Sequence, residues 1–76
     1  MIYGKYRAKV VKVDEKKRRI RVKCEDIYGD YESPWCTPCL PFNHAELNAY
    51  PEVDDNVWIE FEDGNINKPI WCGTWI

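Results

Sequence analysis

The chain has 76 residues, of which 45% are apolar and 32% charged, and its formal net charge is −2. A chain of this size has room for one hydrophobic core, so residues 1–76 are expected to form a single folded domain. No apolar run approaches the roughly 18 residues of a membrane helix, and the N-terminal residues do not resemble a signal peptide, so we expect synthesis in the cytoplasm and no stable membrane insertion.

The first two predicted strands form a hairpin. In residues 6–13 the apolar positions are first even-numbered, as at Ala8 and Val10, and then odd-numbered, as at Val11 and Val13. A change of phase within one strand indicates a β-bulge. The second strand follows a polar turn, and its apolar positions are Ile20, Val22 and Cys24.

The middle of the chain contains several prolines. Three of them fall in residues 34–41, which therefore suit an edge strand or an extended arm better than a central strand. Asn43, followed three residues later by Glu46, predicts the start of a helix, and Pro51 leaves room for about two turns. We expect a short helix between the third and fourth strands.

The last two strands lie in the C-terminal third of the chain. Val57, Ile59 and Phe61 alternate with polar or aromatic residues, and residues 70–76 supply a fifth strand after a turn that contains glycine. Five strands with a short helix between the third and fourth match the OB-fold, a five-stranded Greek-key barrel. An SH3-like barrel has similar strand spacing, but the helix favours the OB-fold. The predicted fold is therefore an all-β OB-type barrel.

Tryptophan and tyrosine are unusually frequent. Four Trp, five Tyr and two Phe exceed what so small a core can enclose, and such residues are enriched where proteins meet. Trp58 and Trp71 are out of phase with their apolar neighbours, which predicts that both face outward; the alternative is that each covers one end of the barrel. The candidate interface residues are Trp58, Trp71, Trp75 and Trp35.

Three stretches resemble a known family. They are Gly-Lys-Tyr-Arg-Ala-Lys-Val at 4–10, Ser-Pro-Trp-Cys-Thr-Pro at 33–38, and Val-Trp-Ile-Glu-Phe-Glu-Asp-Gly at 57–64 with Lys-Pro-Ile-Trp-Cys-Gly-Thr-Trp at 68–75. Together they resemble the N-terminal OB domain of the central spike protein of contractile phage tails, the baseplate assembly protein V family, which has relatives in type VI secretion spikes. Cys36 departs from the family pattern, which usually has a small apolar residue there.

The resemblance implies a structural role without catalysis or cofactor. In that family the domain is a virion component of the tail baseplate, where it joins the spike or needle region to the baseplate hub protein as one of three copies. A following region carries a β-helix and sometimes a lysozyme, so a sequence that stops at Ile76 is expected to be either the first domain alone or a stand-alone adaptor.

Basic residues gather around the first hairpin: Lys16, Lys17, Arg18, Arg19, Arg21 and Lys23. An OB barrel that binds single-stranded nucleic acid combines a basic groove with exposed aromatic rings, so this is the alternative function. Acidic residues on both sides of the cluster weaken its field within a Debye length of about 8 Å. We therefore expect no nucleic-acid binding.

The four cysteines raise the question of a metal or a disulfide. Cys36 and Cys39 have the spacing of a zinc knuckle or a redox pair, but Cys24 and Cys72 are far apart in the sequence, whereas a strong zinc pattern has two close pairs. We expect free structural thiols and no metal, and a small metal-stabilised module remains a third hypothesis. His44, the single histidine, has no nucleophile or acid at a recognisable spacing, so no enzyme is expected.

Overall fold

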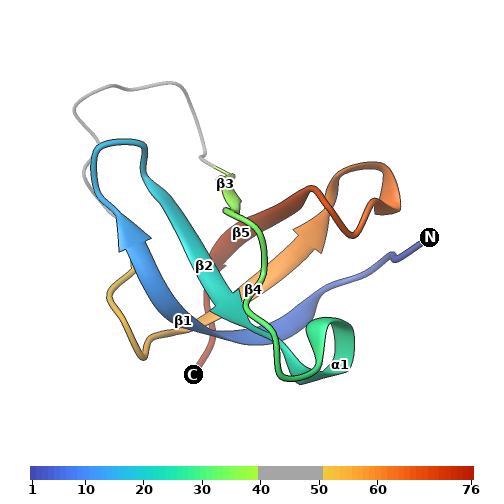
Figure 1. Ribbon diagram of the computed structural model, residues 1–76, viewed down its shortest axis with the longest axis horizontal. Helices are drawn as coiled ribbons and strands as arrows, with labels where there is room; N and C mark the ends of the chain where they lie inside the picture. Colours follow the sequence, from blue (N-terminus) through green and yellow to red (C-terminus); the bar gives the residue numbers. More distant parts are fainter. Residues whose placement is uncertain (40–50) are drawn as a thin grey trace.

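The computed structural model describes residues 1–39 and 51–76. Its main feature is a curled five-stranded sheet (Figure 1). The elements are β1 (Tyr6–Asp14), β2 (Arg19–Lys23), α1 (Glu25–Tyr28), β3 (Thr37–Pro38), β4 (Asn56–Phe61), the 3-10 turn η1 (Glu62–Gly64) and β5 (Pro69–Thr74). The sheet is a half-barrel, which confirms the predicted all-β OB-type fold.

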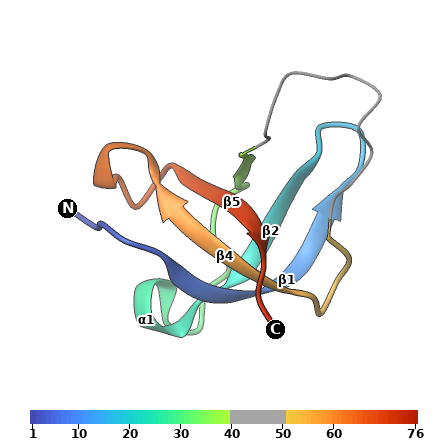
Figure 2. The ribbon, with the colours of Figure 1, turned by 180° about the vertical axis from the view of Figure 1, so that it is seen from behind.

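The strand order is β2-β1-β4-β5-β3, and only the β3–β5 pair is parallel among the described strands. Two isolated bridges, Ile20 to Cys36 and Lys23 to Glu32, connect the segment before β3 to the outer edge of β2. The segment that leads into β3 therefore touches the edge of β2, and both views show the strands curling around a common centre (Figures 1 and 2). The β1–β2 hairpin forms one wall of this half-barrel, and the β4–β5 pair forms the opposite wall (Figures 1 and 2).

Strand β1 belongs to both walls. Its first half, from Tyr6 to Lys9, pairs with β4, and its second half pairs with β2, with a register shift between Val10 and Lys12. A bulge bends a strand and increases its twist, which lets one strand leave one pairing for another. The bulge predicted from the change of apolar phase is confirmed.

The core is formed by the inward positions of β1, β2 and β4, as their alternation predicts. The buried apolar residues are Ala8, Val10, Ile20, Val22, Cys24, Cys36, Val57, Ile59, Phe61 and Trp71. Phe61 is flanked by Tyr6 and Tyr28, whose ring centroids lie 6.1 and 6.2 Å from its own. Each fully buried aliphatic side chain of this kind contributes about 1.5–3 kcal/mol, so the core is the main source of stability.

The outer edge of β2 is covered partly by a side chain. Ser33 is buried; its hydroxyl accepts a hydrogen bond from the Val22 N–H at 2.9 Å and donates one to the Pro34 carbonyl at 2.8 Å. The Ser33 N–H in turn donates to the Val22 carbonyl at 2.9 Å. Backbone groups that would otherwise be exposed at this edge are therefore paired.

One short helix is described, and it lies between β2 and β3. Residues Glu25–Tyr28 form a single turn that closes onto the Cys24 carbonyl and ends at Gly29, whose φ of 61° favours glycine. The sequence of this stretch does not predict a helix, because one turn is too short to produce helical periodicity. The helix predicted from Asn43 lies outside the described residues.

Candidate protein interface

The outward face of β1 and β4 carries a cluster of one arginine and two tryptophans. Arg7 and Trp58 are cross-strand neighbours, and the chain after β5 brings Trp75 beside them. The Arg7 Cζ atom lies 4.6 Å from the centroid of the Trp75 ring and 5.4 Å from that of Trp58, and the two ring centroids are 6.3 Å apart. We call Arg7, Trp58 and Trp75 the arginine–tryptophan cluster.

Local pairing explains why these three side chains meet. Trp58 alternates with the buried Val57 and Ile59 and so leaves β4 on its outer face. The backbone N–H of Trp75 donates to the Asn56 carbonyl at 3.2 Å, which keeps the end of the chain beside β4. Both indoles are half-buried, and Arg7 is exposed. Among the described residues no carboxylate lies within ion-pair distance of Arg7.

The expected outward position of Trp71 is wrong. Its side chain is 7% exposed and belongs to the core. In β5 the inward positions are Pro69 and Trp71, and Trp71 is opposite the buried Ile59. Because residues 70–72 are all apolar, their sequence does not reveal which of them points inward; the register with β4 decides it.

Trp35 lies in a different region. Its side chain is 38% exposed, and the guanidinium of Arg21 lies 4.8 Å from its ring centroid. Arg21 and Arg19 come from β2, and Arg19 Nη1 donates to the Thr37 hydroxyl at 2.9 Å. The structure therefore brings together two of the four predicted interface tryptophans, Trp58 and Trp75, and keeps Trp35 apart from them.

The basic hairpin is internally engaged in part. Asp14 Oδ1 accepts the backbone N–H groups of Lys16 and Lys17 at 3.1 and 3.3 Å, which folds the turn around a negative charge. Arg21 lies over the Trp35 ring and occupies one of its faces. A base-stacking surface needs an uncovered ring, so these contacts favour a structural role for the hairpin.

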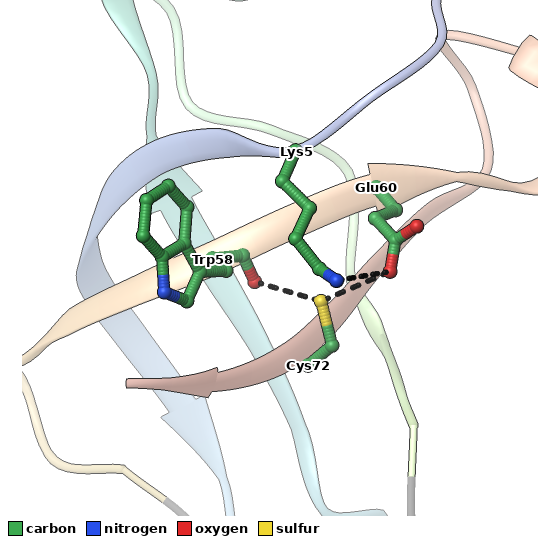
Figure 3. A network of polar contacts seen from close by, with 4 residues as sticks. All are labelled: Lys5, Trp58, Glu60 and Cys72. Carbon is green, nitrogen blue, oxygen red and sulfur yellow. Dashed lines mark hydrogen bonds and ion pairs between the residues drawn. The ribbon is translucent and has the colours of Figure 1, made fainter. Parts of the chain in front are cut away.

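A polar network adjoins the arginine–tryptophan cluster (Figure 3). The Cys72 Sγ atom lies 3.3 Å from Glu60 Oε1 and 3.6 Å from the Trp58 carbonyl, and Lys5 Nζ lies 4.0 Å from the same Glu60 oxygen. Burial, followed by the hydrogen bond and charge of Glu60, raises the pKa of Cys72 to about 11. The thiol is therefore protonated at neutral pH, and the network connects β4 and β5 to the residue before β1.

The cysteines occupy different environments. Cys24 and Cys36 are buried in the core, Cys39 is exposed and Cys72 is half-buried, all as free thiols. Within residues 1–39 and 51–76 no three cysteine, histidine or acidic side chains are grouped as a metal site would require. His44 lies outside these ranges. The absence of metal and of catalysis thus remains a prediction from the sequence.

The fold and this surface define an OB-type domain with an aromatic outer face. A family model described as the type VI secretion system/phage-baseplate injector OB domain matches residues 6–75. The chain belongs to this family, which confirms the resemblance found in the three sequence stretches. A comparison with curated proteins found no match. The family establishes a structural role in a baseplate or injector; it is not a known enzyme family. No helix in the described part of the chain could span a membrane.

Proposed function

We propose that this domain joins the central spike to the baseplate hub in a contractile-tail virion, and that the arginine–tryptophan cluster is the contact surface. Three copies surround the spike axis in the assembled particle. The observation that carries the proposal is the close packing of Arg7 against two neighbouring indoles, Trp58 and Trp75. Trp71 is part of the core and is not part of the proposed contact.

The cluster has the properties of a binding hot spot. Tryptophan and arginine are the residues whose truncation most often costs an interface more than about 2 kcal/mol. Two partly buried indoles offer a rigid apolar surface at low entropic cost, because Arg7 already restricts them. Arg7 has no ion-pair partner in the described part of the chain, so its guanidinium can donate to acceptors of a docked protein.

The test is binding of the hub protein from the same particle to the immobilised chain and its variants. We expect Trp58→Ala and Trp75→Ala each to weaken binding by about 30-fold, the equivalent of about 2 kcal/mol. Trp35→Ala is the matched control, because Trp35 is also partly exposed and also lies against an arginine. Circular dichroism confirms that each variant is folded.

If Trp58→Ala and Trp75→Ala bind the hub protein as tightly as the parent chain does, and Trp35→Ala loses binding, the contact surface lies around Trp35 instead.

The oligomeric state of the chain without the hub protein is measured separately by sedimentation. We expect the chain to be largely monomeric at micromolar concentration. It should associate with the hub or at high concentration, because association adds stability that so small a barrel does not gain from its own core.

Single-stranded nucleic-acid binding is the alternative function, and the basic hairpin is the observation in its favour. Contacts to phosphates make binding fall steeply with salt, whereas docking through an apolar surface depends on salt only weakly. We expect no salt-sensitive binding of labelled single-stranded DNA or RNA. Micromolar binding at low salt that is lost in the triple variant Arg18→Ala, Arg19→Ala, Arg21→Ala would reverse the order of the two functions.

A further inference from the structure

Cys39 and Cys72 are neighbours on adjacent strands, although 32 residues separate them in the sequence. In the parallel pairing of β3 with β5, Pro38 is opposite Trp71. The Cys39 N–H donates to the Trp71 carbonyl at 2.9 Å, so the pairing continues past the end of β3. One further residue along this register, Cys39 is opposite Cys72.

The two side chains leave the sheet on the same face. Trp71 points into the core, so Cys72 points outward, and Cys39 is exposed. Neighbouring strands lie about 4.8 Å apart, within the range of about 4.4–6.8 Å between the Cα atoms of disulfide-bonded cysteines. The backbone register therefore brings the Cα atoms of Cys39 and Cys72 into the range that a disulfide spans.

Cys36 is the partner that the sequence spacing suggests for Cys39, and the structure makes it the poorer one. Cys36 is 0% exposed and lies in the core, whereas Cys39 is on the outer face. Residues three apart on an extended chain point to opposite faces and are about 10 Å apart. A bond between Cys36 and Cys39 would require the extended backbone to fold back on itself.

We propose that Cys39 and Cys72 form an oxidisable pair, which closes to a disulfide by exchange with a low-molecular-weight disulfide and so links the end of β3 to β5. The pair is a modification site, and it is independent of the proposed contact with the hub. Cys24 and Cys36 remain reduced, because the core shields them from the reagent.

The exchange takes place in two steps. The Cys39 thiolate attacks one sulfur of the reagent, which forms a mixed disulfide and releases one reagent thiolate. Cys72 then loses its proton to solvent, against the hydrogen bond that its thiol donates to the Glu60 carboxylate at 3.3 Å. Its thiolate attacks the Cys39 sulfur and releases the second reagent thiolate. Two protein thiols are oxidised and one reagent disulfide is reduced to two thiols, so atoms and electrons balance.

The second step depends on pH. Three groups face the Cys72 thiol: Glu60 from β4 and Cys39 from the end of β3 raise its pKa, and Lys5 lowers it, in addition to the larger effect of burial. Thiolate at Cys72 is therefore scarce at neutral pH, and ring closure is expected to accelerate as the pH rises. Removal of the Glu60 charge is expected to accelerate it as well.

The experiment treats the reduced full chain with oxidised glutathione at about pH 7 and about pH 9, then blocks free thiols and maps chymotryptic peptides by tandem mass spectrometry. We expect the chain to lose the mass of two hydrogen atoms and to contain a Cys39–Cys72 link, which forms several-fold faster at the higher pH. Cys72→Ser retains glutathione on Cys39. Glu60→Gln forms the link faster than the parent, and Cys24→Ala, the matched control, forms it at the parental rate.

Three results would contradict the proposal: a Cys36–Cys39 link, glutathione retained on Cys39 of the parent chain at both pH values, or no reaction at Cys39. The parent chain alone distinguishes these outcomes, so the test survives a variant that does not fold. Because the peptide map does not involve a hub protein, its failure is also distinguishable from failure of the proposed function.

Discussion

Two regions of this small barrel place an arginine against tryptophan, and they differ in what the arginine does. Arg7 lies against two half-buried rings on the outer face of β1 and β4 and has no ion-pair partner among the described residues. Arg21 lies against the single, more exposed ring of Trp35 beside the basic hairpin. Arg7 contacts two rings that also lie beside each other, whereas Arg21 contacts one ring that remains exposed. The same pair of residue types thus makes one region suited to docking and leaves the other solvated.

The largest expected effect comes from the tryptophan that belongs to neither region. Trp71→Ala should lower the free energy of unfolding by about 3–5 kcal/mol, because it removes a large buried side chain and leaves a cavity. Trp35→Ala, at the solvated surface, should cost less than about 1 kcal/mol. Urea denaturation measures both. Equal losses would show that inward and outward tryptophans do not differ as the structure indicates.

Cys36 directly follows Trp35 but lies in the core, and alkaline pH should test how its thiol contributes to stability. Burial raises the pKa of Cys36 to about 11 from the ordinary value of 9.0. This thiol ionises at a lower pH in the unfolded chain than in the folded chain. Its contribution to the free energy of unfolding is therefore fully present below about pH 9 and falls by roughly 2 kcal/mol as the pH rises to about 11. Urea denaturation across this range tests the loss. Cys36→Ala should remove this share of the loss and leave the share of Cys72, whose pKa burial also raises to about 11.

The smallest effect is the coupling within each arginine–tryptophan contact. A double-mutant cycle of Arg7→Ala with Trp75→Ala should give a coupling free energy of about 1 kcal/mol, since the rings are partly desolvated. The matched cycle of Arg21→Ala with Trp35→Ala should give about 0.5 kcal/mol at its more exposed site. Denaturation midpoints at constant m-value measure both. A larger coupling in the second cycle would reverse the assignment of the two regions.

Much of the fold could be predicted from local patterns. The strict alternation of β2 and β4 and the change of phase in β1 gave the core positions and the bulge, because a half-buried strand must alternate. The direction of Trp71 could not be predicted, since its neighbours Ile70 and Cys72 are also apolar and only pairing with β4 fixes the phase. Helix α1 was missed because a single turn has no periodicity to detect.

The candidate interface could be predicted only in part. The excess of tryptophan pointed to an outer aromatic surface, and the phase of Trp58 placed it there correctly. Arg7 was not singled out, although it alternates with the buried Ala8 and so was detectable as an outward position. Its meeting with Trp58 and Trp75 depends on the register of β1 with β4 and on the path of the chain after β5. Such long-range pairings have no local signal in the sequence.

The covered edge of β2 also limits how copies of this domain can assemble. With Ser33 paired to both backbone groups of Val22, and with Cys36 and Glu32 bridged to the same strand, this edge does not present an open row of donors and acceptors. An open edge is a template for strand addition and for amyloid-like growth when many identical chains are held close together. At high concentration, copies of this domain are therefore unlike chains with an open edge, because their sheets cannot merge through the edge of β2.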